Sequence, residues 1–224
     1  MPWELFEHAA PKYAEWYATR RGRRIDQAEC GLLARLLRYF PAARTALEIG
    51  CGTGHFTHWL TSRAMKGVGM DRSPAMLREM RRRFPDVPAI LAEAHCLPFG
   101  GAAVDLVVYV TTLEFLDQPA RALGEGVRIA RQGVILLVLN RWSLGGLSRR
   151  WGPQAHQPLL GQAQDFSLAT LQRIVKESAE RRFREMHWSS VIFPGCPWGV
   201  RAPIPLGDVI GLAAVLTRSL SEKH

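Results

Sequence analysis

The residues best suited to hold a ligand form a glycine-rich turn in the first quarter of the chain. Residues 48–54 read Glu-Ile-Gly-Cys-Gly-Thr-Gly, and the apolar run Thr45–Ile49 predicts a strand that leads into them. Glycines there let the backbone bend sharply and let a ligand lie against the main chain. In the dinucleotide fingerprint the third glycine comes one position later. Glu48 would also repel a pyrophosphate, so the turn favours a ligand with an ammonium group or a bound-water network.

Two further acidic residues follow the next two predicted strands. Asp71 ends the strand Gly67–Met70, and a carboxylate there can accept hydrogen bonds from both hydroxyls of a ribose, although it could instead cap a turn. Glu93 follows the strand Ala89–Ala92, where it could accept a hydrogen bond from an adenine amino group while the N–H of Ala94 donates to the ring. Because parallel strands end at one edge of a sheet, we expect these acids to lie near one another.

The elements that must position these residues alternate between short apolar runs and amphipathic segments. Beyond the three strands already given, we expect strands at Asp105–Val110 and Gly133–Leu139, and helices at Leu5–Phe40, Gly54–Arg63, Ser73–Phe84 and Pro119–Ala130. This alternation predicts an α/β fold with a doubly wound, mostly parallel sheet. Right-handed crossovers then place the strand carboxyl ends, and the ligand crevice, on one edge.

After Asn140 this rhythm changes. Glycines and prolines predict an irregular insertion at Arg141–Asp165 and a loop or lid at Pro194–Pro205. Between and after them we expect a helix at Ser167–Ala179, a strand at Phe183–Phe193 and a last element at Val209–Thr217. For the last element we favour a strand over a helix, because Gly207 and Gly211 weaken a helix.

Segments 46–56, 67–77, 92–99 and 105–117 together resemble the class I S-adenosylmethionine (SAM)-dependent methyltransferases, in particular the ubiquinone/menaquinone-biosynthesis-like (type 11) branch. The resemblance spans Thr45–Leu139. It implies a seven-stranded Rossmann-like methyltransferase sheet with an N-terminal helical cap, SAM as cofactor and S-adenosylhomocysteine as product. The implied division is a cap at 1–43, a SAM-binding core at 44–140, and a substrate-pocket insertion with the last helix and C-terminal strands at 141–224.

The resemblance assigns the cofactor contacts residue by residue. The methionine part of SAM would be held by Glu48, Gly50, Cys51, Gly52, Thr53 and Gly54. Asp71 would hold the ribose, Arg72 and Met76 would lie beside the adenosine, and Glu93 and Ala94 would bind the adenine. Thr111 would offer its carbonyl to the methionine amine, and Tyr13 and Thr19 would close the site. A histidine pair that many relatives carry after the fourth strand is replaced here by Leu113-Glu114-Phe115. No activating histidine can therefore be carried over.

Catalysis of methyl transfer is mostly a matter of positioning, and a general base is needed only when the methyl acceptor must lose a proton. The sequence fixes no catalytic base, and Glu114 and Tyr13 are weak candidates. The segments 141–165 and 194–205 carry Trp142, His156, Trp198 and Arg201, which we expect around the methyl acceptor. Their aromatic and proline content predicts a small apolar or planar acceptor with one anionic group, methylated on O, N or C. The same residues could simply pack an irregular cap.

The formal net charge of +9 keeps other functions open. An RNA methyltransferase would use such a positive charge to bind its substrate. However, the chain has Thr111-Thr112-Leu113-Glu114 at the position where amino-directed nucleic-acid methyltransferases carry the Asn/Asp-Pro-Pro motif. Basic helix faces exposed to solvent explain the charge equally well. A non-catalytic SAM-binding protein is a further alternative, and a NAD-dependent oxidoreductase a more distant one.

The four cysteines are widely spaced, so the sequence indicates neither disulfides nor a metal site. No secretory signal opens the chain, and no apolar stretch is long enough to span a bilayer as a helix. We therefore expect a cytoplasmic protein with a small-molecule partner, and the sequence does not fix its oligomeric state.

Overall fold

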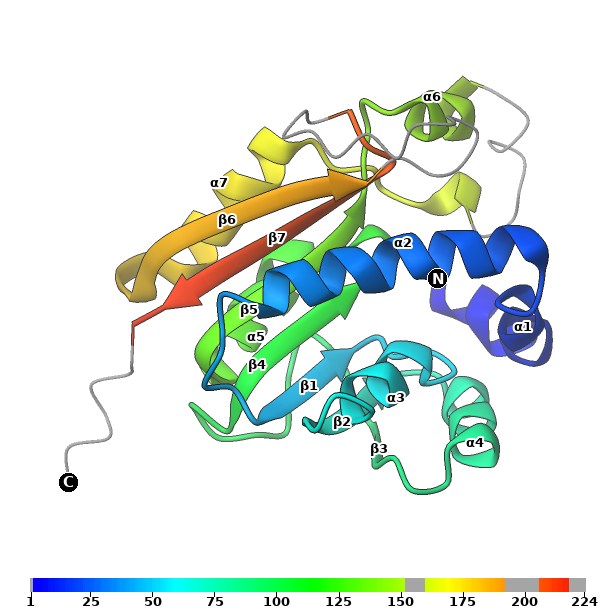
Figure 1. Ribbon diagram of the computed structural model, residues 1–224, viewed down its shortest axis with the longest axis horizontal. Coiled ribbons are helices and arrows are strands. Elements are labelled where there is room, and N and C mark those ends of the chain that lie inside the picture. Colours follow the sequence, from blue (N-terminus) through cyan, green and yellow to red (C-terminus); the bar gives the residue numbers. More distant parts are fainter. Residues whose placement is uncertain (1, 152–159, 192–205, 218–224) are drawn as a thin grey trace.

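The computed structural model describes residues 2–151, 160–191 and 206–217, and in these ranges seven strands form one sheet in the order β3-β2-β1-β4-β5-β7-β6 (Figure 1). The strands are β1 (Thr45–Ile49), β2 (Lys66–Asp71), β3 (Ala89–Leu91), β4 (Val104–Val110), β5 (Ala130–Leu139), β6 (Phe183–Val191) and β7 (Val209–Leu216). All neighbours pair in parallel except β7, which runs antiparallel to both β5 and β6. The predicted mostly parallel, seven-stranded sheet is confirmed.

Helices cover both faces of this sheet. They are α1 (Pro2–Trp16), α2 (Arg20–Leu37), α3 (His55–Thr61), α4 (Pro74–Arg83), α5 (Pro119–Ile129), α6 (Leu144–Trp151) and α7 (Leu168–Ala179). Strand β5 shows why two layers form: the side chains of Val134 and Leu136 pack with α5 and α7, and those of Ile135 and Leu137 pack with α2 and α3. Successive side chains of a strand point to opposite faces, so a strand apolar at every position is buried on both.

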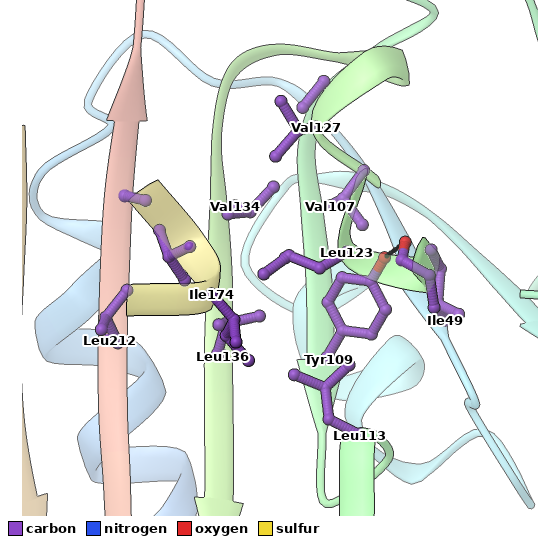
Figure 2. Packing of buried hydrophobic residues seen from close by; sticks show 14 of the residues in the cluster. Ile49, Val107, Tyr109, Leu113, Leu123, Val127, Val134, Leu136, Ile174 and Leu212 are labelled. Atoms are coloured by element: carbon purple, nitrogen blue, oxygen red, sulfur yellow. Dashed lines mark hydrogen bonds between the residues drawn. The ribbon is translucent and has the colours of Figure 1, made fainter. Parts of the chain in front are cut away.

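Tyr109 of β4 lies at the centre of the face covered by α5 (Figure 2). Its ring is fully buried among aliphatic side chains that include Leu123, and its hydroxyl donates a hydrogen bond to the carbonyl of Ala122 at 2.7 Å. A buried phenol needs such a partner, because an unpaired polar group inside a protein costs about 1–3 kcal/mol.

The expected helix Leu5–Phe40 is wrong in one respect, because the chain breaks it into α1 and α2. Thr19 caps α2: its backbone is extended, and its Oγ1 accepts a hydrogen bond from the N–H of Gly22 at 2.9 Å and donates one to the carbonyl of Trp16 at 2.7 Å. A threonine side chain that bonds nearby backbone groups competes with the helix, and the apolar periodicity does not reveal this.

The stretch Arg141–Asp165 is also more regular than expected, because it contains α6 and a short 3-10 turn at Leu160–Gln162. Gly146 explains the difference: a Cβ at this position would lie 2.3 Å from the carbonyl oxygen of Asn140, so the glycine lets the helix start against the end of β5. The last element is the strand β7, as predicted. The loop expected at Pro194–Pro205 lies outside the described residues.

Three of the four cysteines fall within the described residues, and all three are free thiols. None of the helices in these ranges combines the length and the apolar character needed to cross a membrane.

Two glycines of α5 offer a matched test of this packing. A Cβ on Gly126 would lie 2.3 Å from the hydroxyl oxygen of Tyr109, whereas a Cβ on Gly124 would meet nothing within 4 Å. We expect Gly126→Ala to lower the free energy of unfolding by about 1–3 kcal/mol through overpacking. Gly124→Ala should raise it by about 0.5–1 kcal/mol, since alanine favours a helix. Urea denaturation of both variants measures this, and equal effects would contradict the packing described.

Candidate functional site

The glycine turn lies at the carboxyl end of β1, where left-handed backbone angles require glycine. Gly50 has a φ of 72°, and a Cβ there would lie 2.2 Å from Thr112 Cγ2. Gly52 has a φ of 53°, but its Cβ would face open space, with Met76 Sδ and Tyr13 Cε1 the nearest atoms at 3.9 Å. The backbone of Gly52 is therefore the surface that the turn offers to a ligand.

Asp71, at the end of β2, fixes this turn. Its Oδ2 accepts a hydrogen bond from the N–H of Gly52, and its Oδ1 accepts one from the N–H of Ser73, both at 2.8 Å. A carboxylate offers about four acceptor sites, so these bonds leave acceptor capacity for a ligand. Burial raises the pKa of Asp71, and the hydrogen bonds from backbone N–H groups oppose that rise.

Glu48 is a buried acid under the turn. It is 1% exposed, and the hydroxyl of Thr57 donates a hydrogen bond to its Oε2. Burial raises the pKa of Glu48 to about 8, with Thr57 opposing the rise and the charge of Asp71 adding to it. A cation bound nearby would favour the ionised form.

Glu93, after β3, lies at the rim of the site and is already paired. Its Oε2 lies 3.0 Å from Arg72 Nη1, and its Oε1 lies 2.7 Å from His95 Nδ1. Ala94 beside it is buried at 6% exposure. These contacts hold the Glu93 carboxylate in a fixed position where the first strands of the sheet end.

Aromatic rings from α1 and from Tyr17, the residue after it, line one part of the site. The Tyr17 ring stacks on His55 with centroids 4.0 Å apart, and the Phe6 ring meets Phe115 edge-on at 4.8 Å. The hydroxyls of Tyr13 and Tyr17 share a hydrogen bond, and burial raises the pKa of Tyr13 to about 12. Both phenols are therefore protonated at neutral pH, so neither carries a charge into the pocket.

A carboxylate on α1 holds this aromatic lid against α4. Glu7 accepts hydrogen bonds from the Ser73 hydroxyl and from the N–H of Ala75 at 3.2 Å, and it lies 3.6 Å from Arg78 Nη2. These donors belong to the first turn of α4, where an acid is favoured by the helix dipole. The Ser73 hydrogen bond is the main cause of the lowered pKa of Glu7.

These elements enclose one cavity that brings most of the predicted residues together. Its lining includes the following predicted cofactor residues: Tyr13, Glu48, Gly50, Cys51, Gly52, Thr53, Asp71, Arg72, Met76, Glu93, Ala94 and Thr111. Two predicted residues lie outside the lining. Thr19 is the exposed cap of α2, and Gly54 is the left-handed N-cap of α3.

The two weak candidates for catalysis differ in position. Tyr13 lines the cavity, whereas Glu114 does not: it is fully buried and its Oε1 accepts a hydrogen bond from the N–H of Leu139 at 2.5 Å. Thr111 lines the cavity with a φ of 47°, a strained conformation for a β-branched residue.

Of the four residues expected around the methyl acceptor, the structure describes Trp142 alone. Its side chain is 58% exposed and does not line the cavity. Trp198, His156 and Arg201 lie outside the described residues.

Several site residues escaped the sequence reasoning. Tyr17 and Phe6 line the cavity, and the sequence offered no signal that would have placed either ring there. His55 Nε2 lies 2.6 Å from Asp26 Oδ1, and the thiol of Cys30 donates to the same oxygen at 3.2 Å. These three side chains could ligate a cation.

Comparison with known proteins gives the class of this domain. Residues 47–138 match a family described as a methyltransferase domain. An uncharacterised methyltransferase of Mycobacterium bovis is 37% identical over 92 residues, which cover 41% of this chain and 37% of that protein. A demethylmenaquinone methyltransferase of Renibacterium salmoninarum is 30% identical over 140 residues, covering 60% of this chain and 56% of that protein. The chain thus spans between a third and three fifths of the length of these relatives.

A solved structure extends the likeness over almost the whole chain. It is a SAM-dependent methyltransferase of Thermotoga maritima, described as a possible histamine N-methyltransferase, with 25% identity and a TM-score of 0.80. The alignment covers 95% of this chain and 99% of that one. Residues 47–138 are therefore similar in sequence to a methyltransferase domain, and the chain shares the fold of a SAM-dependent methyltransferase over almost its whole length.

The two glycines of the turn predict different outcomes. Gly52→Ala should lower the free energy of unfolding by about 1–2 kcal/mol, the cost of a left-handed alanine, and should weaken SAM binding because its methyl group enters the cavity. Gly50→Ala should destabilise the fold further through its clash with Thr112. Thermal unfolding measures the loss of stability in each variant, and calorimetric titration measures its affinity for SAM. Gly100→Ala serves as control, because a Cβ at that position would meet nothing within 4 Å. Unchanged SAM affinity in Gly52→Ala would contradict the placement of the ligand.

The buried acid Glu48 predicts proton release on SAM binding. Its folded-state pKa is raised from 4.5 to about 8, so the ligand-free protein keeps a proton that an unfolded chain releases, and stability falls as pH rises across that window. The positive charge of SAM should lower this pKa, so binding near pH 7 releases up to about one proton. Calorimetric titration with SAM in buffers of different ionisation enthalpy gives the number of protons released on binding. The Glu48→Gln variant should release fewer protons than the wild type. Equal proton release by both proteins would contradict the assignment of the proton to Glu48.

Proposed function

We propose that this protein transfers a methyl group from SAM to a small, planar or apolar organic acceptor. The observation that carries the proposal is the cavity at the carboxyl edge of the sheet, which joins the glycine turn and four acids to a wall of aromatic rings. Such a cavity suits a small molecule, since ring surfaces exclude water and a few polar groups fix orientation.

The residues of the cavity fit SAM on physical grounds. The open backbone at Gly52 would receive the methionine part, with Glu48 as the nearest buried acid, and the free acceptor sites of Asp71 would take the ribose hydroxyls. Glu93 and the N–H of Ala94 would meet the adenine, with Arg72 and Met76 beside the adenosine and the carbonyl of Thr111 toward the methionine amine.

Methyl transfer asks this chain mainly for positioning and for a dry site. SAM supplies an electrophilic methyl group on a sulfonium centre. The rings of Tyr13, Tyr17, Phe6 and Phe115 would exclude water and confine the methyl acceptor in line with that methyl group. Tyr13 would act by shape and hydrogen bonding rather than as a base, because its pKa lies at about 12.

An RNA substrate is the second candidate, and the net charge of +9 favours it. The closed aromatic wall favours a small molecule instead. Two expectations from the sequence stay predictions. The first is the division into a cap at 1–43, a core at 44–140 and a pocket region at 141–224. The second is the location in the cytoplasm.

Labelled SAM tests the proposal. Incubation of the protein with methyl-labelled SAM and a pool of cell metabolites should place label in the small-molecule fraction, and incubation with total RNA should not label the RNA. Label in RNA alone would overturn the assignment to a small molecule, and label in neither fraction would favour a SAM-binding protein without turnover.

Asp71→Asn tests the cofactor contacts. It removes a charge that anchors Gly52 and would accept the ribose, and hydrogen bonds to charged groups contribute about 1.5–3 kcal/mol each. We expect the SAM dissociation constant to rise by roughly 10–100-fold. Asp86→Asn, on the exposed surface, serves as control and should bind SAM as the wild type does.

A further inference from the structure

Among the described residues, one group of side chains brings three possible metal ligands together beside the cavity. It consists of Asp26 and Cys30 of α2 and His55 of α3, and one ligand atom from each lies within 4.8 Å of the other two. His55 lines the cavity, whereas Asp26 and Cys30 do not. The group therefore touches the cavity through its histidine alone.

Two of these residues share one face of α2, and the third begins the next helix. Asp26 and Cys30 are four positions apart, so their side chains lie one above the other on the helix. His55 follows the glycine turn directly, as the first residue of α3. Helices α2 and α3 cover the same face of the sheet, where Leu33 and Phe56 belong to one buried cluster (Figure 1). The packing of the two helices thus brings the three ligands to one place.

The ring of His55 is held in position by two aromatic neighbours. The Tyr17 ring stacks on it with centroids 4.0 Å apart and an interplanar angle of 14°, and the Phe56 ring meets it edge-on at 5.1 Å. A ligand side chain that is already fixed loses little conformational freedom when it binds an ion. The aromatic contacts therefore favour binding by a histidine in this orientation.

Both other groups converge on one oxygen of Asp26. His55 Nε2 lies 2.6 Å from Asp26 Oδ1, and the Cys30 thiol donates a hydrogen bond to the same oxygen at 3.2 Å. In a tetrahedral zinc site with bonds of about 2.0–2.3 Å, the ligand atoms lie roughly 3.3–3.7 Å apart. Side-chain shifts on the order of 1 Å would thus admit an ion in place of the two hydrogens. The side chains of Asp26 and His55 are 24% and 22% exposed, so an ion can reach them from solvent.

We propose that Asp26, Cys30 and His55 bind a zinc ion. Thiolate, imidazole and carboxylate are ligands that zinc takes, whereas magnesium and calcium prefer sets of oxygen atoms. Binding forms bonds from the ion to Cys30 Sγ, His55 Nε2 and a carboxylate oxygen of Asp26. The thiol proton leaves to solvent, and the Nε2 hydrogen of His55 moves to Nδ1 of the same ring, so one proton is released for each ion bound.

An ion at this position would join the N-terminal helices to the cofactor end of the sheet. Asp26 and Cys30 lie on α2, and His55 is the residue directly after Gly54 of the glycine turn. Three protein ligands leave a fourth position for water or another ligand. The spacing of the cysteines in the sequence gave no sign of such a site, because only the packing of α2 against α3 brings its members together.

Cobalt(II) tests the site, because it occupies zinc sites and absorbs light when a thiolate binds it. The full chain, reduced and freed of metal with a chelator, is titrated with Co²⁺. We expect a thiolate-to-cobalt charge-transfer band that saturates at one equivalent, and one equivalent of Zn²⁺ should remove it. Absence of this band in the wild type would overturn the proposal.

Variants of each ligand, with a matched cysteine control, assign the band. Cys30→Ser should lose it, whereas Cys96→Ser, which changes an exposed free thiol, should keep it. Asp26→Asn keeps the size of the side chain, and His55→Phe keeps a ring against Tyr17; each should weaken Co²⁺ binding by at least about tenfold. A band that survives in Cys30→Ser, or an unchanged affinity in both other variants, would overturn the site.

Thermal unfolding separates loss of a ligand from loss of the fold. An ion that binds only the folded chain stabilises it, so Zn²⁺ should raise the Tm of the wild type and of Cys96→Ser and leave that of Cys30→Ser unchanged. Mg²⁺ should raise none of them. If Cys30→Ser does not fold, Asp26→Asn takes its place in this comparison. An equal rise with Zn²⁺ in the wild type and in the ligand variant would contradict the proposal.

Discussion

The carboxylate of Asp71 is the interaction on which the site depends. It joins the glycine turn after β1 to the start of α4 by accepting hydrogen bonds from Gly52 and Ser73. Ser73 in turn donates to Glu7, so the lid helix α1 is attached to the same network. The carboxylate of Asp71 thus holds the backbone of the glycine turn and the start of α4 in position. Through Ser73 it also fixes the position of α1.

The second constraint is the burial of acids in a region with few positive charges. Glu48 and Glu29 both have pKa values raised to about 8, and desolvation is the largest cause for each. Glu48 lines the cavity, so a cationic ligand bound there would favour its ionised form. A protein of net charge +9 thus has a cavity lined by acids, because its basic residues lie mostly on the surface.

The sequence predicted the sheet and the cofactor end of the site well, because both follow from local patterns. Buried strands such as β5 are apolar at every position, and the glycine turn and Asp71 follow strands at a recognisable spacing. The sequence pattern could not predict the break between α1 and α2, because that break depends on hydrogen bonds from the side chain of Thr19 to nearby backbone groups. It could not predict α6 either, because two glycines in this segment are unfavourable for a helix. Glu7 also gave no signal, because its role arises only when α1 packs against the start of α4.

The most direct test of a SAM site at the glycine turn is a calorimetric titration of the whole chain with SAM and, separately, with NAD. We expect saturable binding of SAM at one site and no comparable binding of NAD, because Glu48 and the early third glycine disfavour a pyrophosphate. Absence of SAM binding, or tighter binding of NAD, would contradict it.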